Sequence, residues 1–120
     1  FNIGKIGETS VAEYYKMQGY NIVAQNWRWS NKGEVDIIAF DRSNNTLVFC
    51  EVKTRRRDSV VKGSEAVNYK KQQKIRRLAT VFLQKNTIYN VCDIRFDVAD
   101  VIADVESLKI SKIDLIENAF

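Results

Sequence analysis

Asp36, Glu51 and Lys53 have the residue types and the spacing that could form a divalent metal site. Asp36 lies within the apolar run 33–40, and Glu51 and Lys53 close a second apolar run, 46–53. Carboxylate oxygens are hard ligands of the kind that Mg²⁺ prefers. One functional interpretation is therefore a metal ion held by Asp36 and Glu51, with Lys53 beside it.

Both runs are rich in β-branched and aromatic residues, which predicts two strands joined as a hairpin. If Asn44 and Asn45 form a two-residue loop, Asp36 lies opposite Lys53 and one diagonal step from Glu51. All three side chains then share one face. A loop that differs by one residue would move Asp36 to the other face.

Both faces of the predicted hairpin are otherwise apolar, which is typical of strands in the centre of a sheet covered on both sides. An unpaired carboxylate in that position costs several kcal/mol or takes up a proton. The charges therefore need compensation. The alternative to a metal ion is cross-strand pairing of Asp36 with Lys53 and of Glu34 with Arg55.

The composition predicts one soluble globular domain over residues 1–120, with 45% apolar and 28% charged residues. No stretch approaches the roughly 20 apolar residues of a membrane span, and no signal-peptide pattern opens the sequence, so we expect a cytoplasmic location. The chain contains no histidine, which excludes a Ser-His-Asp triad. Cys50 and Cys92 lie in apolar runs and are expected to be reduced core residues.

The net charge is +4, and the basic residues are clustered while the C-terminal third is acidic. A basic patch beside paired acids suits a phosphate-bearing partner. The candidate nucleic-acid-binding residues are Arg55, Arg56, Arg57, Lys70, Lys71, Lys74 and Arg77.

The remaining patterns predict an α/β domain, with a mixed sheet of four to five strands flanked by helices. The third and fourth strands are expected to be parallel, because a helix connects them. The other predicted elements are helix 4–19, strand 20–29, helix 64–85 with Ser64 as N-cap, strand 89–103, a weaker strand 107–111 and a closing helical turn within 113–120.

Several side chains have two interpretations. Glu8 is expected in the first turn of its helix, where it could serve only as a favourable terminal charge. Lys71 falls in the apolar stripe formed by Val67, Ile75, Leu78, Ala79 and Phe82, so it must either extend outward to solvent or meet an anion. Trp27 and Trp29 could stack on bases or cap the core.

An acid on one strand followed by Glu-x-Lys on the next resembles the core of the restriction-endonuclease-like nuclease superfamily. Val35 departs from the superfamily pattern, in which proline often precedes the acid. A second set of motifs extends along nearly the whole chain: Gly7-Glu8 with Ala12 and Tyr15, Gly19-Tyr20, Asn26-Trp27-Arg28, Gly33-Glu34-Val35-Asp36, Phe49-Cys50-Glu51-Val52-Lys53-Thr54-Arg55, Lys71, Arg95-Phe96-Asp97 and Asn118-Ala119-Phe120. With these motifs the chain resembles the YraN-like family of small bacterial proteins, which are predicted to be endonucleases related to archaeal Holliday junction resolvases.

This resemblance implies a restriction-endonuclease-like fold and an Mg²⁺- or Mn²⁺-dependent endonuclease. Asp36, Glu51 and Glu8 would be metal ligands, and Lys53 would orient or deprotonate the attacking water. These roles require the three carboxylates to converge around one cavity. The resemblance further implies DNA as partner, branched DNA among its forms, and a homodimer.

Two other functions stay open at this point. The fold could serve as a non-catalytic nucleic-acid-binding module in which the acidic side chains only form salt bridges with basic side chains. Alternatively, the acidic C-terminal third could be the working surface of a protein-interaction adaptor.

Overall fold

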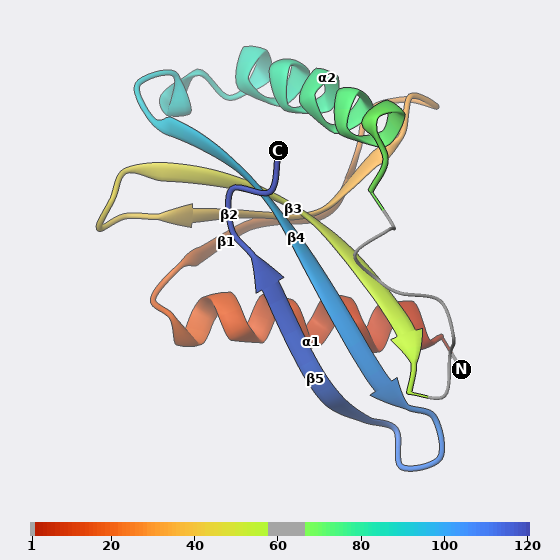
Figure 1. The fold of residues 1–120 in the computed structure, drawn as a ribbon. Coiled ribbons are helices and arrows are strands. Elements are labelled where there is room, and N and C mark those ends of the chain that lie inside the picture. Colours follow the sequence, from red (N-terminus) through yellow and green to blue (C-terminus); the bar gives the residue numbers. More distant parts are fainter. Residues whose placement is uncertain (1, 58–66) are drawn as a thin grey trace.

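Apolar strands and two amphipathic helices alternate along the chain and fold into a five-stranded sheet with one helix on each face (Figure 1). The computed structural model describes residues 2–57 and 67–120. This arrangement confirms the predicted α/β class and is consistent with a restriction-endonuclease-like fold. The elements are α1 (Ile3–Met17), β1 (Asn21–Arg28), β2 (Glu34–Asp41), β3 (Thr46–Arg56), α2 (Tyr69–Lys85), the 3₁₀ helix η2 (Thr87–Tyr89), β4 (Asp93–Asp104) and β5 (Lys109–Ile116).

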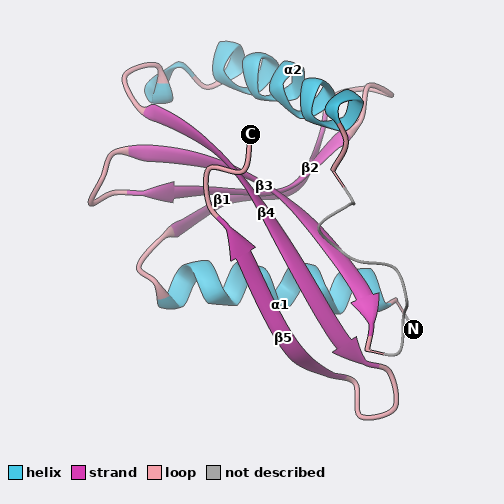
Figure 2. Cartoon of the chain, viewed as in Figure 1, coloured by secondary structure: helices cyan, strands magenta, loops and turns pink. Residues whose placement is uncertain are grey.

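The strands follow one another across the sheet in the order β1-β2-β3-β4-β5 (Figure 2). Neighbouring strands are antiparallel except β3 and β4, which are parallel as predicted. In the described part of the chain, no helix is long and apolar enough to cross a membrane.

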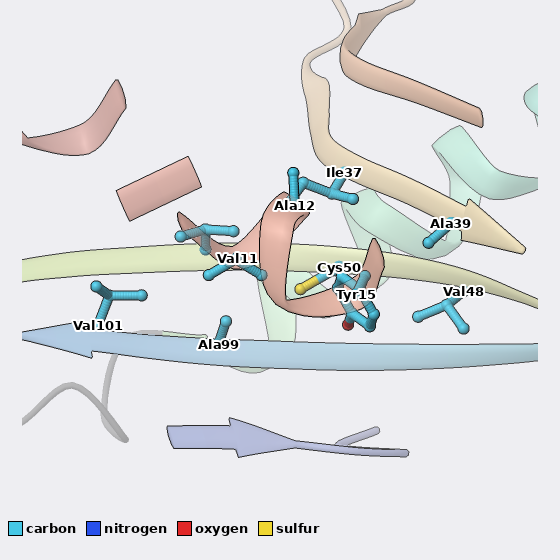
Figure 3. Close-up of a cluster of buried hydrophobic side chains, with 10 residues drawn as sticks. Val11, Ala12, Tyr15, Ile37, Ala39, Val48, Cys50, Ala99 and Val101 are labelled. Carbon is cyan, nitrogen blue, oxygen red and sulfur yellow. The ribbon is translucent and has the colours of Figure 1, made fainter. Parts of the chain in front are cut away.

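Each face of the sheet carries its own apolar core, which is why the central strands are apolar at both even and odd positions. On the α1 side, Val11 and Tyr15 pack against Ile37, Cys50 and Ala99 (Figure 3). On the α2 side, the helix residues Ile75, Leu78, Ala79 and Phe82 pack against Val35, Ile38, Leu47, Phe49 and Phe96. Cys50 is a buried free thiol as expected, whereas Cys92, also free, is only half-buried.

Helix α1 begins one residue earlier and ends two residues earlier than predicted. The Asn2 side chain caps it by accepting hydrogen bonds from the backbone N–H groups of Gly4 and Lys5. Gly19 follows the helix with a φ of +93°, which is a conformation that glycine adopts at little cost.

The β2–β3 loop is longer than predicted. Asp41 still pairs with Thr46, so the loop comprises four residues, 42–45, instead of two. The Asp41 carboxylate stabilises this longer loop by accepting hydrogen bonds from Ser43 N and Asn44 Nδ2. Because the loop is longer by an even number, the predicted clustering on one face survives, but this register sets Asp36 level with Glu51, not Lys53.

Helix α2 starts at Tyr69, later than expected. Asn68 is its N-cap, and its side chain accepts a hydrogen bond from Lys71 N, so residues 67 and 68 are not helical. The predicted N-cap Ser64 lies outside the described residues.

The C-terminal elements also differ from the prediction. Strand β4 begins at Asp93, after η2, and β5 extends through Ile116, so the expected helical turn within 113–120 is wrong. Ile110, Ile113 and Leu115 of β5 pack against the α1-side core, which favours a strand over a helix there.

Helix α1 lies close to β3 because residue 7 has no side chain. A Cβ on Gly7 would collide with the Oγ1 atom of Thr54, the residue after Lys53. Gly7 therefore fixes how the N-terminal half of α1 sits relative to the candidate site.

We predict that Gly7→Ala destabilises the fold. Alanine gains about 1 kcal/mol of helix propensity over glycine, but overpacking typically costs about 1–3 kcal/mol, and the β-branched Thr54 has little freedom to move. Urea unfolding of Gly7→Ala, Thr54→Ala and the double variant measures the effect. Thr54→Ala should relieve the collision, so a double variant that shows the simple sum of the two single effects contradicts this explanation.

Candidate active site

A pocket of about 400 Å³ lies between the sheet, α2 and the turn that joins β1 to β2. Asp36 comes from β2, Glu51 from β3, and Lys71 and Lys74 from α2. The remaining lining residues are Arg28, Asn31, Gly33, Glu34, Ile75 and Leu78. The pocket thus combines three acidic and three basic side chains over an apolar wall.

Asp36 occupies the point where the pairing of β2 with β3 ends. The last paired residues are Ile37 and Cys50, whereas β2 still pairs with β1 as far as Glu34. Val52 of β3 lies past the last backbone pair with β2. Its N–H group donates a hydrogen bond to the Asp36 Oδ2 atom at 2.8 Å, so this carboxylate oxygen takes the place of a β2 backbone carbonyl. This bond fixes one carboxylate oxygen of Asp36 in the sheet.

The Asp36 carboxyl has a strongly shifted pKa. Its side chain is buried, with 8% of the residue exposed. Burial raises the pKa of Asp36 to about 7, and the charge of Glu51 adds to the shift; the Val52 hydrogen bond opposes it. The smaller contributions come from Glu8 and Glu34, which also raise the pKa. Within residues 2–57 and 67–120, no basic side chain forms an ion pair with Asp36.

Glu51, in contrast, is compensated by two lysines. Lys71 Nζ lies 3.0 Å and Lys53 Nζ 3.7 Å from the same Glu51 oxygen, Oε1. The Lys71 side chain is 39% exposed, but its ammonium group meets an anion, the carboxylate of Glu51. Lys53 shares the α2 face of the sheet with Glu51, as its position two residues later on β3 requires.

Glu8 does not join these two acids. It lies in the second turn of α1, not the first, and its carboxylate accepts a hydrogen bond from Asn26 Nδ2 at 2.9 Å and lies 3.5 Å from Lys5 Nζ. Glu8 is absent from the pocket lining, and residues 2–57 and 67–120 contain no cluster of three acidic or cysteine ligands arranged for a metal. The expected convergence of Glu8, Asp36 and Glu51 is therefore not found; of these three, Asp36 and Glu51 line the pocket.

The predicted ion pairs of the alternative interpretation are also different from those observed. Glu34 pairs with Arg28 at 3.1 Å, not with Arg55. Arg55 instead lies 3.6 Å from Asp100 of β4. The register explains both: Arg28 is directly opposite Glu34 on β1, whereas β2 and β3 have separated at this end.

The candidate nucleic-acid-binding residues fall into separate groups. Lys71 and Lys74 line the pocket, and Lys70 and Arg77 are exposed on the same helix. Arg56 and Arg57 border a different hollow, shared with the acidic residues Asp104 and Glu106. The basic residues nearest the acids are thus those of α2.

Two features of the pocket were missed by the sequence analysis. Arg28 and Asn31 line it, although nothing in the spacing of the β1–β2 turn marked them. Gly33 has a φ of +127°, and a Cβ there would collide with the aliphatic stem of Lys74. A glycine before a strand that carries acids was a signal of this close approach.

Comparison with known proteins gives consistent matches along the chain. Residues 7–101 match the model of a family described as "Uncharacterised protein family UPF0102". A UPF0102 protein of Clostridium botulinum strain 657 is 44% identical over 119 residues, which cover 99% of this chain and 94% of the relative. A UPF0102 protein of Alkaliphilus metalliredigens is 40% identical over 99% of this chain and 97% of its own length.

We predict that Asp36→Asn stabilises the metal-free protein at alkaline pH. The folded-state pKa of Asp36, about 7, lies above the unfolded value of roughly 3.9, so the folded state holds a proton that the unfolded state releases as pH rises from about 4 to 7. Native stability is lost over that range. Asparagine carries no charge and can still accept the Val52 hydrogen bond.

Urea unfolding with a chelator present should show Asp36→Asn more stable than wild type at pH 8, by on the order of 1–3 kcal/mol. The difference should shrink as the pH approaches 4. Asp93→Asn, at an exposed position, is the control. A difference that is independent of pH would contradict the assignment.

Proposed function

The chain belongs to the family UPF0102, and for it we propose a metal-dependent endonuclease activity that hydrolyses phosphodiester bonds in DNA. The observation that carries the proposal is the buried pair of Asp36 and Glu51 in one pocket, with Lys71 in the lining and Lys53, which is outside the lining, 3.7 Å from Glu51. A merely structural core gains nothing from a buried carboxylate without a positive partner, because its desolvation costs free energy. Perturbed acids in a cleft are typical of functional sites.

The two carboxylates fit a hard divalent cation. Asp36 has one oxygen bound by Val52 N and a second oxygen with further acceptor capacity, and Glu51 faces the same pocket. Mg²⁺ or Mn²⁺, when bound, would neutralise the phosphoryl oxygens and lower the pKa of a water molecule. Glu8, held by Asn26 and Lys5, lies outside the pocket lining, so the proposal rests on a site of two carboxylates and not on the three that the resemblance implies.

The lysines have separable roles in this proposal. Lys53 lies beside Glu51 and would orient or deprotonate the attacking water. Lys71 lies 3.0 Å from Glu51 and lines the pocket, so its ammonium group would both balance the charge of this carboxylate and stabilise negative charge on a phosphate oxygen of the substrate.

DNA binding would depend on phosphate contacts. Lys70, Lys74 and Arg77 continue the positive charge of Lys71 along α2. Arg56 and Arg57 border a separate hollow and Arg55 lies beside Asp100, so any DNA contact by these three would lie apart from the α2 residues. Such contacts give an affinity that falls steeply with salt and carry little sequence preference. The resemblance to resolvases supports branched DNA as a substrate and a homodimer as the active form.

A non-catalytic nucleic-acid-binding module is the second candidate. It is favoured by the two lysines that already neutralise Glu51 and by the position of Glu8 outside the pocket lining. In that case Asp36→Ala would leave DNA affinity unchanged or improve it, and no metal would support cleavage.

We predict that cleavage of labelled DNA in Mg²⁺ or Mn²⁺ falls by at least about 10²-fold in Asp36→Ala and in Lys53→Ala, because each removes a group that stabilises the transition state. Four-way junctions, flaps, single strands and linear duplexes are compared. Asp93→Ala and Lys16→Ala, exposed and outside the pocket lining, are the matched controls. No cleavage by wild type in any metal, together with equal DNA binding by all variants, would favour the binding module.

We also predict that Mg²⁺ raises the melting temperature of the wild-type protein at pH 8, because a ligand that binds only the folded state stabilises it. Asp36→Asn and Glu51→Gln should lose most of this shift. An equal shift in wild type and both variants would mean that Mg²⁺ binds elsewhere. This measurement is independent of any nuclease assay.

A further inference from the structure

The two tryptophans at the end of β1 have different environments. Trp27 packs edge-on against Phe82, with the ring centroids 5.2 Å apart, and belongs to the α2-side core. Trp29 lies beyond the strand and is 38% exposed. Core packing therefore explains Trp27 but not Trp29, whose large apolar ring is presented to solvent.

Trp29 borders a groove of about 520 Å³ between the β1–β2 turn and α2. Its apolar lining is completed by Leu78 and Val81. Every charged residue that lines the groove is basic: Lys32 from the turn, and Lys74 and Arg77 from the helix. An occupant must therefore combine a flat or apolar body with negative charge.

The basic residues of α2 near Trp29 form one continuous stripe. Lys70, Lys74 and Arg77 recur every three or four residues, and Val81 and then Lys85 continue the same side of the helix, so four basic residues and one apolar residue share it. Lys85 Nζ lies 4.3 Å from the centroid of the Trp29 ring, a cation–π distance, but Lys85 does not line the groove. Lys85 therefore lies over one face of the indole, and a base held in the groove would stack on the other face.

The groove is continuous with the candidate active site. Lys74 and Leu78 line both, and the Lys74 stem passes over Gly33 at the start of β2. Residues of α2 and of the β1–β2 turn line both hollows, and Figure 1 shows this turn at the level of α2. A chain bound in the groove would lead directly to Asp36 and Glu51.

We propose that the Trp29 groove binds an unpaired nucleotide of single-stranded DNA next to the bond to be cut. The base stacks on the indole, and the flanking phosphates contact Lys32, Arg77 and Lys85. A nucleotide in duplex DNA cannot do this, because its base is already stacked between neighbours. This inference rests on the proposed endonuclease function. It narrows the expected substrates to DNA that carries an unpaired segment beside a duplex.

The test measures binding of a short thymidine oligonucleotide and of an abasic oligonucleotide of the same length, with a chelator present so that no cleavage occurs. Trp29→Ala should weaken binding of the thymidine strand by about tenfold, in the range found for single stacked bases, and leave the abasic strand nearly unaffected. Trp29→Phe should retain most of the affinity. Tyr14→Ala, an exposed aromatic position on α1, should change neither.

Equal losses for the thymidine and abasic strands, or no loss for either, would overturn the inference. Melting temperatures of Trp29→Ala and Trp29→Phe verify that both variants are folded. Asp36→Ala is measured in parallel. If it retains a Trp29-dependent preference for the thymidine strand but wild type cuts no DNA, the endonuclease proposal fails while the nucleotide site stands.

Discussion

The burial of Asp36 and Glu51 beneath α2 is the constraint on which the rest of the site depends. Two carboxylates enter a sheet whose faces are both covered by helices, so water cannot solvate them fully. Glu51 is compensated by lysines from β3 and α2, whereas Asp36 keeps one hydrogen bond and a raised pKa. A cation shared by the two acids would remove this imbalance, which is why we interpret the pair as functional.

The surrounding elements preserve the charge imbalance between Asp36 and Glu51 and do not relieve it. Strand β2 separates from β3 at Asp36, which opens the pocket, and the Val52 hydrogen bond prevents the carboxylate from turning away. Gly33 allows Lys74 to pass close to the β1–β2 turn, so α2 and the turn together enclose the site and the adjacent Trp29 groove. One helix thus supplies apolar packing toward the sheet and a basic stripe toward solvent.

The sequence predicted the fold class and the clustering of the acids because both depend on patterns of side-chain alternation. An error of two residues in the β2–β3 loop preserved parity, so Asp36 and Glu51 still shared a face although the exact pairing was wrong. The position of Glu8 could not be predicted in this way. It depends on how α1 is rotated and placed on the sheet, which the contact between Gly7 and Thr54 determines, and no local pattern encodes that contact. Lys71 was recognisable as a cation in an apolar stripe, but its partner, Glu51, became evident only from the packing of α2 on β3.

The most direct test of the central claim is anomalous X-ray scattering from crystals grown with Mn²⁺. The account predicts a peak within bonding distance of carboxylate oxygens from both Asp36 and Glu51. A fully ordered pocket without a peak, at Mn²⁺ concentrations that saturate exposed carboxylates elsewhere, would contradict the claim that these two acids form a metal site.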